Sequence, residues 1–596
     1  MVSVSVALIE GWLPFVAILV LIVLFSTFYV RHFISKYDSE CSSTMAAIIG
    51  LSAALVTSAI VPVDIFLVSY MKDSDGHFRD WANSSSARDH VTNSVLISYY
   101  VMYGLLTFLF FLFLPFMYFF FEEKDDIEQP TVMTRCCGAF KYTFVFVLIA
   151  AVLLILGVSA VVPQRSFWNS SCEVHESGSA RETDRISTRL TKNKSWGRFV
   201  RLKAVLQHGR SQMTETNKKI HTYIHLSSLS ASFFFLFYSF ISGGEDALSF
   251  LISSLSLLGM LAIITYTAYG MSAMPVRLIK GYRNISKDRL AAEQIRSVTT
   301  KNIDDIKSKY TGRRSMSSRD QARISELEEN RRFLERQDRH LAEEQNSCLR
   351  KCLLVFRPFE IFVGVFCLLL TLLIFLSLLL TNIDKAMNSL GYKIGYALPK
   401  STLPNPIDMI LVFSQKVYPL DYIIILLIII YLVFCSISGI RNLGIWFFCV
   451  RLYKIRPYRT TPQGMLMMNM ILMLIVLAIN VILFELTPQY SSFGSEVYVN
   501  TTYVPVGNSS STPPVMSCNV AAPEDLCIMT RLAVLLTKFF YSMWFFGAAY
   551  YWFSWVFLAV IPIGFIIVVV RRRRSAIEGL VDHDDFEDSD DDLIHA

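Results

Sequence analysis

Long apolar runs that are almost free of charge recur along the chain, and polar, charged segments separate them. Each run approaches the roughly 20 residues that an α-helix needs to cross a bilayer. The runs lack the alternation with a period of two that is typical of strands in a membrane barrel. The pattern therefore predicts nine transmembrane helices, at about 12–30, 45–70, 95–120, 143–162, 247–273, 359–381, 419–440, 465–487 and 539–570.

The composition agrees with this pattern. Of the 596 residues, 53% are hydrophobic and only 17% are charged, whereas a soluble protein carries about 25% charged residues. We therefore expect an all-α polytopic membrane protein whose first partner is the lipid bilayer. We expect no nucleic-acid partner.

Charges beside the runs predict which side of the membrane each loop occupies. The first run has no basic segment before it, whereas Arg31 and Lys36 follow it. This favours an uncleaved helix with a lumenal N-terminus. The segments 441–459 and 571–574 are strongly basic, as short cytosolic flanks are, so the C-terminus is expected in the cytosol.

These assignments divide the chain into four parts. The 11-residue apolar run at 231–241 is too short to span and is interpreted as a non-spanning insert. The expected parts are helices one to five within 1–273, with a long lumenal loop at about 164–246; a cytosolic helical loop at 274–358; helices six to nine within 359–570, with a glycosylated lumenal loop at about 488–538; and an acidic, disordered cytosolic tail at 571–596.

The predicted lumenal loops contain a candidate disulfide and candidate glycosylation sites. Cys518 and Cys527 lie close together in the last of these loops, where an oxidising lumen favours a disulfide between them. Five Asn-x-Ser/Thr sequences are candidate glycosylation sites: Asn83, Asn169, Asn193, Asn500 and Asn508.

The cytosolic loop and tail carry candidate interaction signals. Leu327, Leu334 and Leu341 recur every seven residues in a helix-forming stretch, which predicts either a helical hairpin or a docking arm for a cytosolic partner. The sequence YRNI, from Tyr282 to Ile285, fits a tyrosine-based sorting signal.

In the tail, Ser589 precedes three aspartates and is a candidate for phosphorylation by an acidophilic kinase.

Motifs that carry catalysis are missing from the sequence. It contains no GxxxxGK[ST] loop, HExxH or GxSxG, so we expect neither an enzyme nor an ATP-driven pump. His221 and His225 are spaced i,i+4 but lack a third ligand, and we expect no metal site.

A single carboxylate stands inside the second apolar run. Asp64 lies in the sequence IVPVDIFLVSY, two residues after Pro62, and Lys72 marks the expected lumenal edge of the helix. A charge in such a run costs free energy unless it is paired or reaches water. We favour a structural hydrogen bond or ion pair for Asp64; a pH-sensing or partner-contacting role is the alternative.

Several long strings resemble the limb-region/lipocalin-receptor-like membrane proteins, and within them the members that escort a lysosomal cobalamin transporter. The strings are VPVDIFLVSYMK (61–72), SLSLLGMLAIITYTAYGMSAMPVRLIKG (254–281) and GIRNLGIWFFCVRLYKIR (439–456). The resemblance covers the chain except about 172–244.

The resemblance implies nine spans, lysosomal residence and a part in moving cobalamin (vitamin B12) from lysosome to cytosol. It implies three partners: an ATP-binding-cassette half-transporter that the protein escorts and stabilises, a cytosolic cobalamin-processing protein, and a clathrin adaptor that would also require presence at the plasma membrane. Cobalamin would be a transported ligand, and no covalently bound cofactor is expected. A transporter or channel in its own right and an endocytic receptor are the alternatives.

The sequence departs from the family at the expected Tyr-x-x-Leu adaptor signal, since KDRL has Lys287 in place of tyrosine. A second expectation concerns helix packing in the fifth run. There Gly259, Ala262, Ala268 and Gly270 would let another helix approach closely, either within this chain or from a partner.

Overall fold

The structure is a computed structural model. It describes residues 2–35, 40–73, 75–123, 132–152, 244–281, 285–310, 316–346, 356–389, 402–414, 420–447, 450–499, 515–518, 526–542 and 544–571, with 391, 392, 395, 396, 398, 417 and 522. The chain divides into two compact units, residues 1–143 with 254–596 and residues 144–253. The residues that concern function belong to the first unit.

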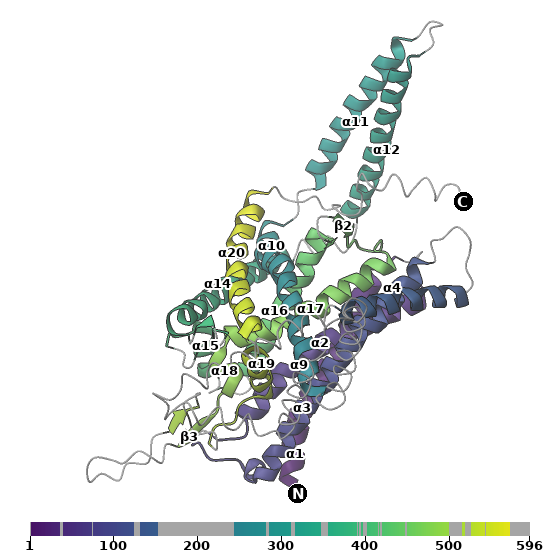
Figure 1. Cartoon of the computed structure of the whole chain (residues 1–596). Helices are drawn as coiled ribbons and strands as arrows, with labels where there is room; N and C mark the ends of the chain where they lie inside the picture. The colour runs from purple at the N-terminus through teal and green to yellow at the C-terminus, as the bar shows by residue number, and fades with distance from the viewer. Residues whose placement is uncertain are drawn as a thin grey trace, which may run out of the picture. The chain divides into compact units, whose positions relative to one another are not determined.

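Within the described residues, nine helices are long and apolar enough to cross a membrane, which confirms the prediction of an all-α polytopic protein. A single chain in lipid satisfies its backbone in this way because helices close all their hydrogen bonds internally. Seven of the spans are α1 (Val2–Phe33), α2 (Cys41–Ser69), the helix Val132–Val152, α14 (Arg357–Asn388), α16 (Leu420–Leu443), α17 (Pro462–Leu486) and α20 (Trp544–Val570) (Figure 1). The third span runs from α3 (Ser85–Phe108) through the π-helical turn η2 (Leu109–Phe113) into α4 (Leu114–Glu122). The fifth span runs in the same way from α9 (Gly244–Ala262) through η4 (Ile263–Thr267) into α10 (Ala268–Lys280).

Some helix boundaries differ from the apolar runs. The third span begins at Ser85, ten residues before its run, because the hydroxyl of Ser84 accepts the Ala87 N–H and starts the helix within a polar stretch. The ninth run is divided between α19 (Arg531–Ser542) and α20. Hydropathy marks the part of a helix that meets lipid, whereas caps decide where the helix starts.

The helix α17 is the most enclosed span, and it packs against α2, α4 and α16. Its side chains are apolar on nearly every face, which is typical of a helix surrounded by others. Its buried polar residues are Gln463, Asn469, Asn480 and Glu485. The Asn469 amide donates to the Ala47 carbonyl of α2 at 2.8 Å, so a polar group links the two helices where water is excluded.

Glycines let the fifth span touch its neighbours backbone to backbone. A Cβ on Gly270 would lie 1.9 Å from the Cys435 carbonyl oxygen of α16, and one on Gly259 would lie 2.0 Å from the Leu474 carbonyl of α17. In the other direction, a Cβ on Gly439 of α16 would lie 1.9 Å from the Tyr266 carbonyl. The two glycines singled out in the fifth run, Gly259 and Gly270, therefore face helices of this chain.

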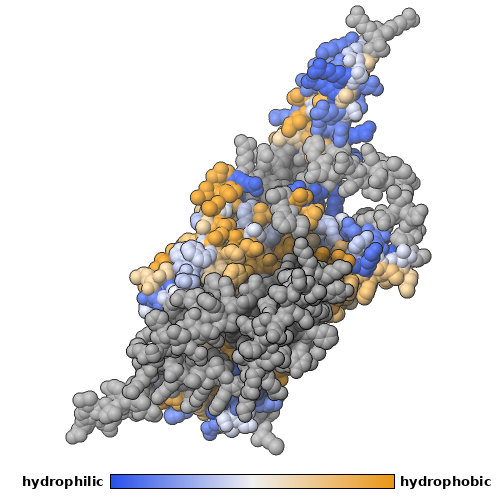
Figure 2. Space-filling view, in the orientation of Figure 1, coloured by the Kyte–Doolittle hydropathy of each residue, from blue (hydrophilic) through white to orange (hydrophobic). Residues whose placement is uncertain are grey.

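Shorter elements connect the spans. The helices α11 (Ile285–Ser308) and α12 (Ser318–Asn346) pack against each other, and the ion pairs Lys307–Glu328 and Arg289–Asp338 join them. Figure 2 shows hydrophilic side chains over this pair and hydrophobic ones over the bundle. The others are η1 (Asp80–Ala82), α15 (Pro406–Ser414), α18 (Pro488–Phe493) and the antiparallel strand pairs β1 (Ile445–Phe447) with β2 (Val450–Tyr453) and β3 (Val497–Val499) with β4 (Val515–Ser517).

Substituting Gly270 with alanine tests the close helix contacts. We expect Gly270→Ala to lower the stability of the purified protein by about 1–3 kcal/mol, because the new methyl group must push α10 away from α16. Thermal unfolding in detergent measures the change. The control is Gly104→Ala in α3, where a Cβ would meet no atom within 4 Å and where alanine should be neutral or slightly stabilising. Equal melting temperatures for the two variants would contradict the packing.

Candidate functional site

Asp64, the carboxylate within the second apolar run, is buried in the structure, and only 1% of its surface is exposed. It projects from α2 to the start of α19, in a segment 467 residues away along the chain. One carboxylate oxygen accepts the backbone N–H of Leu532 at 2.8 Å, and the other accepts that of Arg531 at 3.3 Å. Asp64 of α2 therefore caps the N-terminus of a different helix, α19.

The capping geometry explains why a charge is tolerated there. The first N–H groups of an α-helix have no partner inside the helix, and the helix dipole makes that end favourable for an anion. The carboxylate of Asp64 and the N–H groups of α19 would each be costly if left unpaired away from water. Each satisfies the other.

Asp408 repeats this arrangement on α15, which is a short helix between two spans. Its two oxygens accept the N–H groups of Gln489 at 3.2 Å and Tyr490 at 3.1 Å, in the first turn of α18. The Tyr490 hydroxyl donates in turn to Asp421 at 2.9 Å. Burial raises the pKa of Asp408 from 3.8 to about 6, although the two N–H groups oppose that shift.

Asp384 of α14 binds a connecting segment in a similar way. It accepts the N–H of Thr402 at 2.9 Å and the side-chain amide of Asn388 at 2.7 Å. The next residue, Lys385, pairs with Glu485 of α17 at 2.9 Å. Buried carboxylates thus join connecting segments to the spans at several points.

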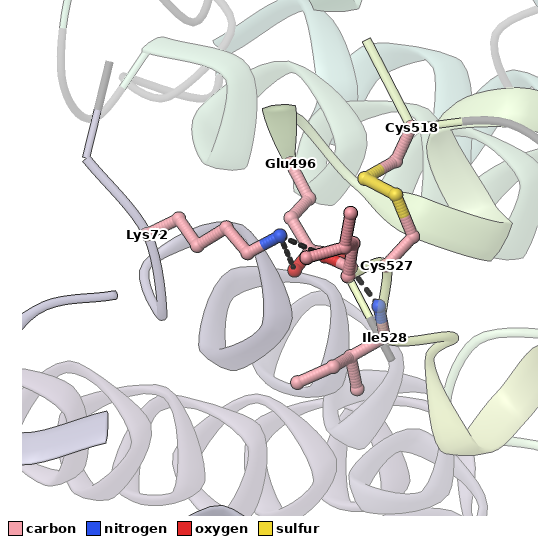
Figure 3. Close-up of a disulfide and its surroundings, with 6 residues drawn as sticks. Lys72, Glu496, Cys518, Cys527 and Ile528 are labelled. Atoms are coloured by element: carbon pink, nitrogen blue, oxygen red, sulfur yellow. Dashed lines mark hydrogen bonds and ion pairs between the residues drawn. A yellow bond between two sulfur atoms is a disulfide. The ribbon is translucent and has the colours of Figure 1, made fainter. Parts of the chain in front are cut away.

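The fourth contact of this type is an ion pair beside a disulfide. Lys72, just after α2, lies 3.0 Å from Glu496, and neither side chain is more than 2% exposed. The other Glu496 oxygen accepts the Ile528 N–H at 2.8 Å, and Lys72 also donates to the Leu526 carbonyl. Figure 3 shows Lys72 pointing toward Glu496 next to the sulfur atoms.

The disulfide joins Cys518 to Cys527, with Cα atoms 5.7 Å apart. The Cys518 N–H donates to the Glu496 carbonyl at 2.9 Å, so the bridge and the ion pair hold the same loop. Burial raises the pKa of Glu496, while the nearby Lys72 ammonium acts in the opposite direction. We call the assembly of Lys72, Glu496, Cys518, Cys527 and Ile528 the loop clasp, and the end of the bundle that carries it the Lys72 end.

The chemistry of the loop clasp is that of a structural brace. A Glu496 oxygen and the two sulfur atoms lie within 4.8 Å of one another, which is a spacing that could hold a metal ion. However, the sulfurs are bonded to each other and the carboxylate is paired with Lys72. A metal would need thiolate ligands and an unpaired carboxylate, so these residues as arranged do not fit one.

The other residues singled out in the sequence are placed as follows. Asn83 is exposed just before α3, where a glycan would meet no buried surface. Ile285 is the first residue of α11. The remaining predicted glycosylation, sorting and phosphorylation residues lie outside the described residues: Asn169, Asn193, Asn500, Asn508, Tyr282 and Ser589.

Sequence reasoning did not single out Asp384, Asp408 or Glu496. Asp408 follows Pro406 inside a short apolar stretch, which is the same signal that drew attention to Asp64. The sequence around Glu496 and around Lys72 does not predict that the two residues pair, because their contact depends on how segments far apart in the sequence meet in the fold.

Comparison with known proteins identifies relatives along the whole chain. The family model described as LMBR1-like membrane protein matches residues 12–354. A Nematostella vectensis protein named probable lysosomal cobalamin transporter is 41% identical over 597 residues, covering 98% of each chain. The proteins named lysosomal cobalamin transport escort protein LMBD1 from Xenopus tropicalis and Homo sapiens are 40% and 39% identical, covering 98% and 99% of each chain. No solved structure matches the chain.

Asp64 substitutions test the helix cap. We expect Asp64→Asn, which keeps one acceptor oxygen, to lose about 1–3 kcal/mol of stability, and Asp64→Leu to lose more because both N–H groups stay unpaired. Thermal unfolding of the purified protein ranks the variants. The control is Asp75→Asn, since Asp75 is exposed. A Leu variant as stable as wild type would show that the cap contributes nothing.

Asp408 gives a pH dependence with a defined sign. Because its pKa is higher in the folded protein, the folded state binds a proton that the unfolded chain releases between pH 6 and pH 4. Stability should therefore rise as the pH falls from 7 toward 4, on the order of 3 kcal/mol for a shift of about two pKa units. Asp408→Asn should remove that part of the slope in unfolding experiments between pH 4 and pH 7. An unchanged slope would contradict the burial of the charge.

Proposed function

The chain belongs to the LMBR1-like membrane protein family, and from this premise we propose that it acts in lysosomal cobalamin transport. Its role would be that of an escort, which targets and stabilises an ATP-binding-cassette transporter and so enables cobalamin to leave the lysosome for the cytosol. The observation that carries the proposal is the similarity to proteins named as escorts over at least 98% of both chains.

The hydrogen bonds and ion pairs that the buried charges make within this chain favour an escort over a transporter. A protein that moves a large polar ligand itself would be expected to turn ionisable groups of its spans toward a water-filled path. Asp64 and Asp384 are instead bound to backbone N–H groups of this chain, and Glu485 is paired with Lys385. The second candidate is direct transport, which the name of the Nematostella vectensis relative favours.

The same proposal assigns sides and partners. We infer that the Lys72 end faces the lysosomal lumen, since a disulfide persists in an oxidising or extracytoplasmic setting and the exposed Asn83 is a glycosylation candidate. The partner half-transporter would supply nucleotide sites, because the sequence contains no GxxxxGK[ST] loop. The paired helices α11 and α12 would then lie in the cytosol, where a cobalamin-processing protein could bind.

Depletion with rescue separates the two candidate functions. We expect loss of the protein to move the partner transporter away from lysosomes and to trap labelled cobalamin inside them, and we expect wild-type protein to reverse both effects. Imaging of the transporter and fractionation of labelled cobalamin provide the two readouts. Purified protein in liposomes should not move cobalamin unaided. A partner that stays lysosomal, together with transport by the protein alone in liposomes, would establish the transporter instead.

A further inference from the structure

The segment between α16 and α17 exposes large apolar side chains on strands. Trp446 of β1 is 48% exposed, and Val450 and Leu452 of β2 are 63% and 44% exposed. Trp446 and Arg451 are partners across the strand pair. The indole N–H of Trp446 donates to the Leu443 carbonyl at 2.8 Å, so the polar group of the ring is already hydrogen-bonded within this chain.

This segment cannot leave the membrane surface. The span α16 ends at Leu443 and α17 begins at Pro462, so the strands lie between two spans that end beside them. The segment is also joined to the end of α1, because the Thr460 N–H donates to the Phe33 carbonyl at 3.1 Å. Side chains exposed at this level meet the headgroup region, where tryptophan is enriched in membrane proteins.

The charged side chains of the segment are all basic. Residues 441–461 contain no aspartate or glutamate, and their cations are Arg441, Arg451, Lys454, Arg456 and Arg459. Arg451 and Arg459 are exposed, whereas Arg441 covers the ring of Phe33 at 4.7 Å. Basic groups at membrane depth attract acidic lipids.

We propose that residues 444–447 and 450–461 form a binding site for acidic phospholipid headgroups, such as phosphatidylserine, in the leaflet at this end of the bundle. Arg451 and Arg459 would hold the headgroup phosphate and carboxylate. Trp446, which shares one face of the strand pair with Arg451, would enter the interface beside the acyl chains, and Val450 and Leu452 would meet lipid on the opposite face. The lipid is favoured over a soluble partner because the exposed apolar groups and Arg451 share one strand pair held at membrane level, and Arg459 follows it in the same connection.

Quenching of Trp446 fluorescence tests the site. The full-length protein and its Trp446→Phe variant are placed in phosphatidylcholine nanodiscs that contain an equal minor fraction of brominated phosphatidylserine or brominated phosphatidylcholine. The difference between the two proteins gives the Trp446 signal. We expect brominated phosphatidylserine to quench it more strongly. Since each cation near an anionic surface is worth about a five-fold change in binding, Arg451→Gln with Arg459→Gln should remove most of the preference.

The matched control removes two exposed cations from the paired cytosolic helices, with Lys301→Gln and Arg319→Gln, and should leave the preference unchanged. Size-exclusion profiles verify that each variant is folded. Equal quenching by the two lipids, or none by either, would overturn the proposal. Loss of the preference on adding inorganic phosphate or a soluble glutamate-rich peptide would also overturn it, in favour of a soluble anion or an acidic protein partner.

Discussion

A backbone N–H and a carboxylate that are both removed from water each need a partner, and at the Lys72 end of this bundle they satisfy each other. An unpaired buried polar group costs several kcal/mol, and an unpaired charge costs more. The start of α19 meets Asp64 and the start of α18 meets Asp408. Because each contact crosses between segments far apart in sequence, the connecting loops are positioned by the same bonds that make burial of the charges tolerable.

The two ends of the bundle use the helix dipole in opposite senses. At the Lys72 end, carboxylates lie at the N-termini of α18 and α19. At the other end, the Lys280 ammonium donates to the Val568 and Val569 carbonyls at 3.0 and 2.6 Å, at the C-terminus of α20. Each charge lies where the dipole favours its sign. Two further cations of the same end, Arg451 and Arg459, are exposed.

The helices were predictable from sequence, whereas the partners of the buried charges were not. Hydropathy is a local property, so nine runs predicted nine spans, but it placed helix boundaries less well. The helix α3 begins at Ser85, before its run, and the fourth span is the helix Val132–Val152, where the run predicted 143–162. Asp64 could be recognised as a buried charge from its neighbours alone. Its acceptor role could not, because α19 lies 467 residues away. The pairing of Lys72 with Glu496 depends in the same way on the fold.

The packing of the bundle bears on how such a protein could take part in transport. A secondary transporter alternates between two arrangements of its helices around a central site, which requires interfaces that separate or slide. Here the fifth span touches α16 backbone to backbone through Gly270 and Gly439, and sliding would bring side chains into that contact. Separation at the Lys72 end would leave Asp64 and Asp408 without their N–H partners. These contacts oppose movement within the bundle, which agrees better with the proposed escort role than with alternating access by this chain.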